Sequence, residues 1–378
     1  WLNDNCPPSI RTEMPEAEIV SGGMKQRSPN PESYLWLELM HSRGWTVPHW
    51  PKEYGGADLT TDEYVALLQE MSAINARVPL TGMGVSMIGP TLLEYGTSEQ
   101  KTEHLPKIAS GEIRWCQGYS EPGAGSDLAS LQMRAVEDGD NYVINGQKIW
   151  TTLAQHADWI FCLVRTDPEA SKHEGISFML VDMDQPGVTV KPIRLISGAS
   201  PFCETFLDNV RVEKNQVVGE VNQGWTIAKY LLTHEREMIG SFGLTDAGSD
   251  TLGQIAAKTV GVEQGRMNNP LLRADVLKWE IDAAAFALTA ERVTDEVKSG
   301  QGVGATSAML KYYGTELNKR RFELMLKIHG SDAMIWDGAD SNGGWVPRSW
   351  LRTKGNSIEG GTSEVQLNII AKNILGLG

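Results

Sequence analysis

The sequence predicts an α+β protein with an N-terminal helical domain, a middle antiparallel β-barrel or sandwich, and a C-terminal four-helix bundle. Three observations support this fold class. Apolar residues recur at helical spacing in the first third of the chain, alternate with a period of two in the middle, and return to helical spacing afterwards. At 378 residues the chain is longer than most single domains. We therefore expect three domains, at residues 1–115, 116–221 and 222–378.

The first domain is expected to consist of helices joined by turns. The apolar run at residues 34–40 predicts one helix. Thr97 and Gln100 have the spacing of a capping box, which predicts the start of a further short helix. The segments 52–56 and 105–112, both of which contain Gly, are expected to be turns.

The middle domain is expected to be built of short strands bounded by Gly, Pro, Asn or Asp. Asn145-Gly146 is the sequence typical of a type I′ turn, so we expect a hairpin at this point. Several short strands with such punctuation favour a compact antiparallel barrel or sandwich. The expected strands are 132–136, 141–144, 159–165, 177–182, 188–192 and 204–212.

The third domain shows two apolar stripes at helical spacing, which are typical of the core of a helical bundle. A final amphipathic helix is expected after the segment 357–364. The first stripe consists of Leu277, Ile281, Ala284 and Leu288, and the second of Leu310, Tyr313, Leu317, Leu324 and Ile328.

Composition excludes several classes of function. A net charge of −14 argues against a nucleic-acid partner, and no apolar run is long enough to cross a membrane. The seven histidines lack metal-ligand spacing, and the four cysteines are sparse, so we expect no metal site and free thiols. We expect a cytoplasmic location. Because the chain begins at Trp1, a removed targeting segment and the mitochondrial matrix stay open.

Two stretches are candidates for a ligand site. In residues 115–127, Gly123 and Gly125 let the backbone approach a ligand closely, and Ser120 and Ser126 add hydroxyl groups. In residues 145–152, an aromatic ring at Trp150 is followed by two threonines. Together they indicate a pocket for a flat, hydrogen-bonding cofactor, although the pattern is also typical of an ordinary turn.

Six motifs follow one another along almost the whole chain, and their order and spacing carry a resemblance that no single motif would. They are Gly44-Trp with Pro51-Lys-Glu-Tyr-Gly-Gly56, Gly96-Thr-Ser-Glu-Gln-Lys101, Leu105-Pro-Lys-Ile-Ala-Ser-Gly-Glu112, Ser120-Glu-Pro-Gly-Ala-Gly-Ser-Asp127, Ile144-Asn-Gly-Gln-Lys-Ile-Trp150 and Gly360-Gly-Thr-Ser-Glu364. In this order the chain closely resembles the flavin-dependent acyl-CoA dehydrogenase family.

The resemblance implies an FAD held between the β-domain and the C-terminal bundle, and α,β-dehydrogenation of an acyl-CoA to its trans-2-enoyl thioester. It implies electron transfer to an electron-transfer flavoprotein, a role in acyl-CoA catabolism such as β-oxidation, and a homodimer or homotetramer, with a mixed oligomer as an alternative. The residues implied to contact the cofactor are Tyr119, Ser120, Trp150, Thr151, Thr152, Thr362 and Glu364. Those implied to contact the substrate are Ser126, His234, Arg236 and Gly360.

The reaction needs a base for the α-proton, and a carboxylate in a water-poor slot suits that role. Many family members carry a glutamate where this chain has Gly360, and Glu359 is expected to point elsewhere. Another branch places its glutamate before an arginine in the first helix of the bundle, which matches Glu235 and Arg236. We therefore predict Glu235 as the base, although such a charged run is also typical of a solvated helix face.

Two other functions stay open. The chain could be a non-catalytic or half-site partner in a mixed oligomer of related dehydrogenase chains, or a related flavoenzyme that passes electrons to oxygen. A carboxylate facing the flavin and the electron acceptor used in turnover distinguish these alternatives from a dehydrogenase. The sequence does not indicate the length or branching of the acyl group.

Overall fold

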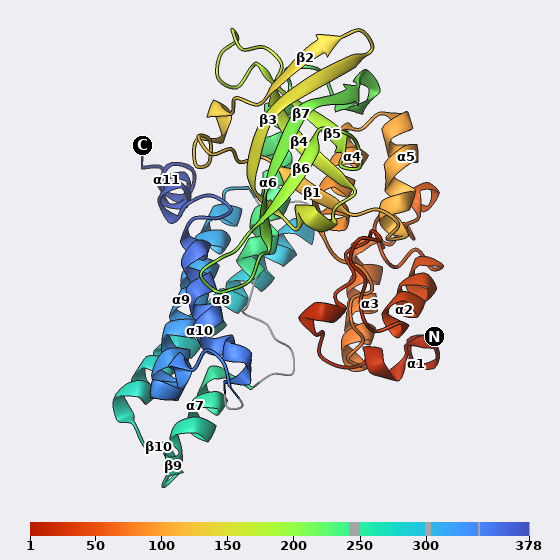
Figure 1. The fold of residues 1–378 in the computed structure, drawn as a ribbon. Helices are drawn as coiled ribbons and strands as arrows, with labels where there is room; N and C mark the ends of the chain where they lie inside the picture. The colour runs from red at the N-terminus through yellow and green to blue at the C-terminus, as the bar shows by residue number, and fades with distance from the viewer. Residues whose placement is uncertain (242–249, 299–303, 339–340, 378) are drawn as a thin grey trace. The chain divides into compact units, whose positions relative to one another are not determined.

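The computed structural model describes residues 1–241, 250–298, 304–338 and 341–377 (Figure 1). The described residues form two compact units. The first comprises Trp1–Ile193 and Ser200–Leu231, and the second comprises Arg194–Ala199 and the chain from Leu232 onward. The predicted order of a helical region, a β-region and a second helical region is confirmed. The domain boundaries after residues 115 and 221 stay a prediction.

Two of the N-terminal helices of the first unit, at residues 61–73 and 98–109, begin at capping boxes. Thr97 accepts from the backbone N–H of Gln100 at 3.2 Å, and the Gln100 side chain accepts from the Thr97 N–H at 3.1 Å. The predicted capping box is therefore confirmed. The helices are α1 (Leu2–Asn5), α2 (Glu32–His41), α3 (Thr61–Ala73), α4 (Gly89–Tyr95) and α5 (Ser98–Ala109).

The expected turn at residues 105–112 is wrong over its first half. Helix α5 continues through Pro106 and ends only at Ala109. Leu105, Ile108 and Ala109 are almost completely buried. Burial of this apolar face outweighs the hydrogen bond that Pro106 cannot donate.

An eight-stranded sheet forms the β-region of the first unit, with its strands in the order β6-β7-β3-β2-β4-β5-β8 and with β1 paired to β4. Most neighbours are antiparallel, as expected, but β1 and β2 run parallel to β4. The inward side chains of these strands form one apolar core. The strands are β1 (Trp115–Gly118), β2 (Arg134–Asp138), β3 (Asn141–Thr152), β4 (Trp159–Arg165), β5 (Ile176–Asp182), β6 (Val188–Ile193), β7 (Phe202–Glu213) and β8 (Val217–Val218).

The predicted hairpin at Asn145-Gly146 is wrong, because strand β3 runs through both residues without a turn. Asn145 instead joins β3 to β7: its Oδ1 accepts from the N–H of Asn209 at 2.8 Å. Gly146 lies at a shift in the β3–β7 register, with a φ of 151°. The reversal occurs earlier, between β2 and β3, where Gly139 has a φ of 61°.

We expect Gly146→Ala to lower the free energy of unfolding by about 1–3 kcal/mol. An added Cβ would lie 3.0 Å from the Cβ of Met133, and the φ of this residue suits only glycine. Gly123→Ala is the matched control, because no atom lies within 4 Å of its added Cβ. Urea denaturation of the three proteins measures the difference. Equal midpoints for the two variants would contradict the tight fit at Gly146.

His104 on α5 is buried against the sheet. Its ring centroid lies 5.2 Å from that of Trp115 and 4.7 Å from that of Trp159. Its Nε2 lies 3.1 Å from Oε1 of Gln216 and 3.6 Å from a carboxylate oxygen of Glu103. Burial lowers the pKa of His104, and the raising effects of Gln216 and Glu103 offset this only in part. The folded protein therefore favours the neutral imidazole.

We expect His104→Gln to reduce the loss of stability between about pH 7.5 and about pH 5.5. An unfolded histidine gains a proton below about pH 6.5. Because the folded state resists that proton, the parent protein loses stability as the pH falls, and glutamine removes this contribution. The control is His49→Gln, since His49 is exposed. Urea denaturation at the two pH values measures the effect, and an unchanged pH dependence in His104→Gln would disprove it.

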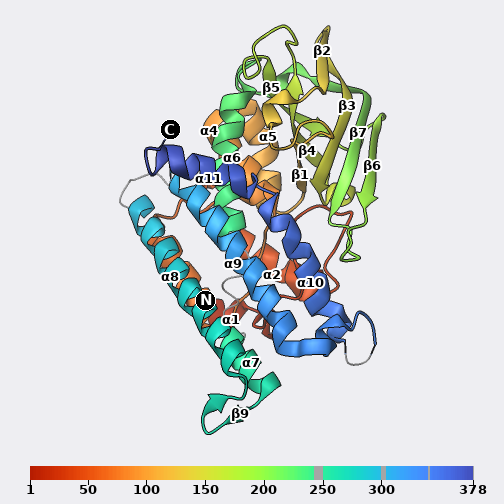
Figure 2. The same ribbon diagram turned by 90° about the vertical axis from the view of Figure 1, so that its left-hand side faces the viewer.

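The second unit consists of helices packed around α9 (Figure 2). Helix α9 contacts α7, α8, α10 and α11. Helix α6 begins in the first unit and continues into the second. The elements are α6 (Gly224–Ser241), α7 (Leu252–Val260), β9 (Val262–Glu263), β10 (Arg266–Met267), α8 (Pro270–Lys298), α9 (Thr306–His329), α10 (Trp345–Thr353) and α11 (Ser363–Asn373).

The first predicted core stripe is wrong. Leu277, Ile281 and Leu288 are 49%, 68% and 67% exposed, and Ala284 is exposed as well. Helix α8 has apolar residues on more than one face, and the face that packs against α9 includes Phe286 instead. The second stripe, on α9, is buried except for Tyr313, which is 38% exposed.

Within the described ranges, no helix has the length and apolar character needed to cross a lipid bilayer.

Candidate functional site

The glycine-rich stretch leaves the sheet where β1 ends. Tyr119 is buried, and Ser120 is half-buried. The carbonyl oxygen of Ser120 accepts from the N–H of Ile149 at 2.9 Å, which joins the stretch to β3. Glu121 and Ala124 then exchange two backbone hydrogen bonds of 3.0 Å and close a tight turn. The two stretches singled out in the sequence therefore lie side by side.

Beyond this turn the loop is accessible. Gly123, Gly125 and Ser126 are exposed. No atom lies within 4 Å of the position that a Cβ would take at either glycine. Asp127, which follows Ser126, forms an exposed ion pair with Lys172. The backbone of this arc is thus open to a ligand, as the sequence predicts from its glycines.

A buried lysine lies behind the loop. Lys148 on β3 is completely buried, and its Nζ lies 2.8 Å from Oε1 of Glu121. The ammonium group also donates to the carbonyl oxygen of Tyr119 at 3.1 Å and to that of Leu163 at 2.7 Å. An ammonium group has three N–H donors, and Lys148 has three acceptors. Sequence reasoning did not single out Lys148 or Glu121.

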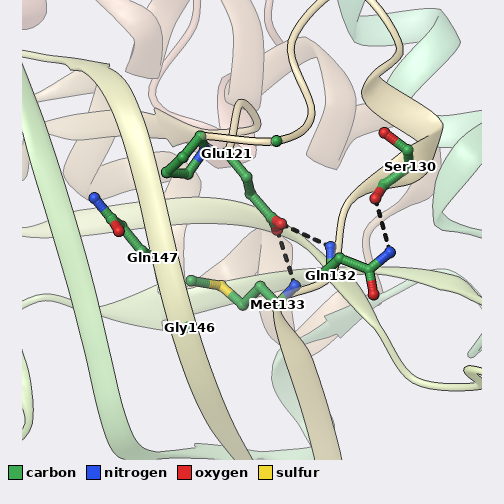
Figure 3. Close-up of a pocket in the computed structure, with 8 residues that line it drawn as sticks. Glu121, Ser130, Gln132, Met133, Gly146 and Gln147 are labelled. Carbon is green, nitrogen blue, oxygen red and sulfur yellow. Dashed lines mark hydrogen bonds between the residues drawn. The ribbon is translucent and has the colours of Figure 1, made fainter.

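The partner of this lysine is itself held by the backbone, as Figure 3 shows. Glu121 accepts from the N–H of Gln132 at 2.6 Å and from the N–H of Met133 at 3.0 Å. An open pocket of about 470 Å³ lies beside this carboxylate. None of the predicted cofactor or substrate contacts lines it, although Gly123 of the glycine-rich stretch does. Its lining residues are Glu121, Pro122, Gly123, Ser130, Gln132, Met133, Gly146 and Gln147.

The end of β3 presents an aromatic surface. Trp150 is 53% exposed, although its ring contacts that of Phe202 edge-on at 6.1 Å. Its φ is 61°, a left-handed conformation that is unusual for a bulky residue. Such outliers concentrate at functional sites, where the surrounding structure keeps them in place. The register of β3 against β7 shifts at this point, which accommodates the conformation.

Two threonines follow this tryptophan. Thr151 is 1% exposed, and within the described part of the chain its Oγ1 has no hydrogen-bond partner. Thr152 is half-buried. A buried hydroxyl without a partner is uncommon in a folded protein and needs an explanation. An open backbone arc, an exposed indole and an unpaired hydroxyl are features that fit a flat, polar ring.

The predicted base and two predicted substrate contacts lie on α6. His234, Glu235 and Arg236 are helical, within the second half of this helix. The side chains of residues 233–241 lie outside the described residues. The roles of these three residues therefore stay predictions.

The segment that carries Gly360 belongs to the second unit and is held by α9 and α11. Lys311 on α9 is completely buried and donates to the carbonyl oxygens of Asn356 at 2.9 Å and Gly361 at 2.8 Å. The side chain of Gln366 donates to the carbonyl oxygen of Gly360 at 2.8 Å. Gly360 and Gly361 have φ values of 63° and 88°, which explains two successive glycines.

Glu359 is engaged within the same unit. Its carboxylate pairs with Arg352 at 2.7 Å and accepts from the side chain of Asn356 at 2.5 Å. Both contacts hold this carboxylate within the second unit. This geometry agrees with the expectation that Glu359 does not take the place of the glutamate missing at Gly360.

Thr362 and Glu364 lie at the start of α11. Thr362 is its N-cap residue, and its Oγ1 accepts from the N–H of Val365 at 3.2 Å. Glu364 is exposed, and hydrogen bonds from its own backbone N–H and from the Thr362 hydroxyl lower the pKa of its carboxyl group. The positive end of this helix is a favourable place for a phosphate.

Other reactive groups of the described residues offer no competing site. All four cysteines are free and buried, and burial raises the pKa of Cys162 to about 12. Such a thiol is a poor nucleophile. No group of three or more His, Cys, Asp or Glu side chains in the described ranges could hold a metal ion.

Comparison with known proteins matches all three parts of the chain to one family. Residues 14–112, 116–210 and 222–375 match the N-terminal, middle and C-terminal domains of acyl-CoA dehydrogenases. The chain is 34% identical to the acyl-CoA dehydrogenase IpdE1 of Mycobacterium tuberculosis, over all of this chain and 95% of that protein. The chain belongs to the acyl-CoA dehydrogenase family. Its members are FAD-binding flavoproteins, and this dehydrogenase is a flavin-dependent oxidoreductase.

Solved structures agree with this assignment. The Tcur3481-Tcur3483 steroid ACAD is 34% identical, with a TM-score of 0.79 over 92% of this chain and 90% of that chain. The ChsE4-ChsE5 complex from Mycobacterium tuberculosis is 32% identical, with a TM-score of 0.73 over 92% of this chain and 93% of that chain. The acyl-CoA dehydrogenase fold predicted from the sequence is therefore confirmed.

Proposed function

We propose that this chain binds FAD at the face formed by the loop after β1 and the end of β3, and that it oxidises an acyl-CoA to the trans-2-enoyl thioester. The observation that carries this proposal is the exposed indole of Trp150, whose backbone has a left-handed conformation. Trp150 follows Ile149, and the N–H of Ile149 donates to the carbonyl oxygen of Ser120. When bound, the flavin would supply the acceptor for the β-hydrogen, and an electron-transfer flavoprotein is the proposed final electron acceptor.

The residues of the first unit divide the task of holding the ring. The indole of Trp150 offers a flat apolar surface, and the backbone and hydroxyl groups of Ser120 offer hydrogen bonds. The buried Oγ1 of Thr151, which has no partner among the described residues, supports an acceptor or donor on the ligand. Thr152, at the end of β3, is the remaining proposed contact to the ring from this strand. Thr362 and Glu364 are proposed to contact the phosphate or ribityl region through the start of α11.

Glu235 is the proposed base. Removing a proton next to a thioester is difficult, and hydrogen-bond donors to the thioester oxygen assist it by stabilising the developing negative charge. Two observations support this residue: the chain has no side chain at Gly360, and the carboxylate of Glu359 is already paired with Arg352. Arg236 is proposed to lie near the CoA portion.

We infer a bulky acyl group as the substrate class. A solved relative that is 34% identical is named as a steroid dehydrogenase of this family, which supports an acyl chain attached to a steroid ring system. A glycine at position 360 leaves room where other members place a glutamate. His234 and Ser126 are the remaining proposed substrate contacts. A cytoplasmic location stays a prediction from the sequence.

The proposed assembly is a homodimer or homotetramer, with a mixed oligomer as the alternative. One relative was solved as a complex of two different chains, which supports the alternative. Size-exclusion chromatography with light scattering on the purified chain decides between them. A monomer that binds no flavin alone but binds it with a related second chain would establish the mixed oligomer.

Anaerobic titration of the purified protein with a panel of acyl-CoAs tests the proposed reaction. The panel contains straight-chain, branched and steroid-linked acyl groups, and flavin absorbance reports reduction. We expect a yellow protein that is bleached most rapidly by a steroid-linked acyl-CoA. A protein that binds no FAD would disprove the proposal. A flavin that no acyl-CoA reduces would favour the non-catalytic partner, and rapid reoxidation by oxygen would favour an oxidase.

A further inference from the structure

We propose that Lys148 is a positioning residue for the flavin ring. By holding the carbonyl oxygen of Tyr119, it turns the N–H of Ser120 out of the sheet and toward the proposed ring site. This inference rests on the proposed binding of FAD at this face. Lys148 would touch neither cofactor nor substrate, and it would act through the peptide unit between Tyr119 and Ser120.

The geometry of the peptide unit gives the first step. In a trans peptide the C=O of one residue and the N–H of the next point in opposite directions. No cis peptide occurs among the described residues. The carbonyl oxygen of Tyr119 lies 3.1 Å from the Nζ of Lys148, which is completely buried. Because this carbonyl points into the sheet interior, the N–H of Ser120 points away from it.

The neighbouring peptide units are held as well. The carbonyl oxygen of Ser120 accepts from Ile149, and that of Glu121 accepts from Ala124. Three successive carbonyl groups, beginning with Tyr119, are therefore bonded within the protein. The first of these bonds is the only one of the three that comes from a side chain, so it can be removed by mutation. Because the carbonyl of Tyr119 is fixed, the N–H of Ser120 in the same peptide unit is fixed too, and a donor fixed in this way needs little reorganisation when a ligand binds.

The choice of lysine follows from its donors. An ammonium group directs three donors roughly tetrahedrally, and here they go to Glu121, Tyr119 and Leu163. Hydrogen bonds from a charged donor are stronger than those from a neutral one. Glu121 balances the charge and is fixed by two backbone amides of its own. The carbonyl of Tyr119 thus accepts from Lys148, whose position is fixed in turn by Glu121.

Two properties of the bound flavin should depend on this lysine. Without it, the Tyr119–Ser120 peptide can turn, and the ring loses a well-directed donor. We expect FAD to bind about tenfold more weakly, the change that one hydrogen bond typically makes. Reduction adds negative charge to the ring, which a nearby donor stabilises, so the midpoint potential should fall when the donor is lost.

Three variants separate positioning from mere stability. Lys148→Met/Glu121→Gln removes the hydrogen bond to Tyr119 without leaving a buried charge alone. Glu121→Gln keeps Lys148, and with it the bond to Tyr119, while it weakens the ion pair. Lys172→Met is the surface control, because its ion pair with Asp127 is exposed. FAD affinity is measured by fluorescence, the midpoint potential by equilibrium dye titration, and stability by thermal melting.

If Lys148 positions the ring, the double variant shows weaker FAD binding, a lower potential and an altered flavin spectrum. Glu121→Gln then loses stability but keeps a potential and spectrum close to those of the parent, and Lys172→Met matches the parent throughout. Flavin properties that follow melting temperature instead of the presence of Lys148 would overturn the proposal. So would a double variant with the affinity, potential and spectrum of the parent.

The parent protein gives a test that needs no variant. Infrared spectra of bound FAD should show a flavin carbonyl stretch at lower frequency than in an aprotic solvent, because a donor is directed at it. A carbonyl band at the aprotic frequency would disprove the inference even if the double variant did not fold. Failure of the parent to bind FAD at all would instead disprove the proposed function, so the two failures are distinguishable.

Discussion

Glu235→Gln should bind FAD as tightly as the parent protein and should lose flavin reduction by acyl-CoA. A positioned general base contributes about 10²–10⁴ in rate, and glutamine cannot accept the α-proton, so we expect a fall of at least that size. Anaerobic stopped-flow absorbance measures the rate directly. The substitution preserves the size of the side chain, so the free energy of unfolding should change by less than about 1 kcal/mol.

The matched control is Glu359→Gln. This residue is adjacent to Gly360, the position of the base in other members of the family, but its carboxylate pairs with Arg352. Loss of that partly exposed pair should cost about 1 kcal/mol or less in stability and leave the rate of flavin reduction near that of the parent. Reduction at the parental rate in Glu235→Gln would disprove the base. Loss of reduction in Glu359→Gln alone would transfer the role to this residue.

Lys148→Met should lower the free energy of unfolding by about 3–5 kcal/mol, because it leaves the buried carboxylate of Glu121 without its cation. Methionine fits the space of the lysine stem, so the effect reports the lost charge and its three hydrogen bonds instead of a cavity. Urea denaturation followed by far-UV circular dichroism measures it. We expect this to be among the largest single effects in the first unit.

A double-mutant cycle tests the cause. In Lys148→Met/Glu121→Gln the uncompensated charge is gone, but glutamine offers one carbonyl oxygen where the carboxylate accepted from both Gln132 and Met133. The double variant should therefore recover part of the lost stability, with a coupling energy of about 1–3 kcal/mol. Effects that simply add would show that the two side chains do not interact, contrary to the observed ion pair.

The fold was predictable where a local signal coincides with tertiary packing. The capping box of Thr97 and Gln100 is such a case, because the same four residues set the helix start in any context. Prediction failed where packing decides between local alternatives. Pro106 lies inside a helix whose buried face outweighs the lost hydrogen bond, and Asn145 bonds to Asn209 on β7 in place of forming a turn.

The α8 stripe shows a different limit of periodicity. Spacing identifies an apolar face, but helix α8 has more than one, and only tertiary contacts show that Phe286 lies inward while Ile281 lies outward. The candidate site shows the same division. Gly123 and Trp150 could be singled out by residue type, whereas the burial of Lys148 depends on a glutamate 27 residues away in the sequence. The side-chain roles of Glu235 and its neighbours stay predictions.

At Trp150 the residue that would be best for stability differs from the residue that would be best for ligand binding. A bulky side chain at a φ of 61° costs about 1–3 kcal/mol, and glycine would remove that cost. Glycine would also remove the indole surface. A chain evolving for thermal stability alone would therefore tend to lose this ring. The left-handed backbone at Trp150 is thus a cost to the folded protein that ligand binding can offset, because FAD that binds only the folded state stabilises it through linkage.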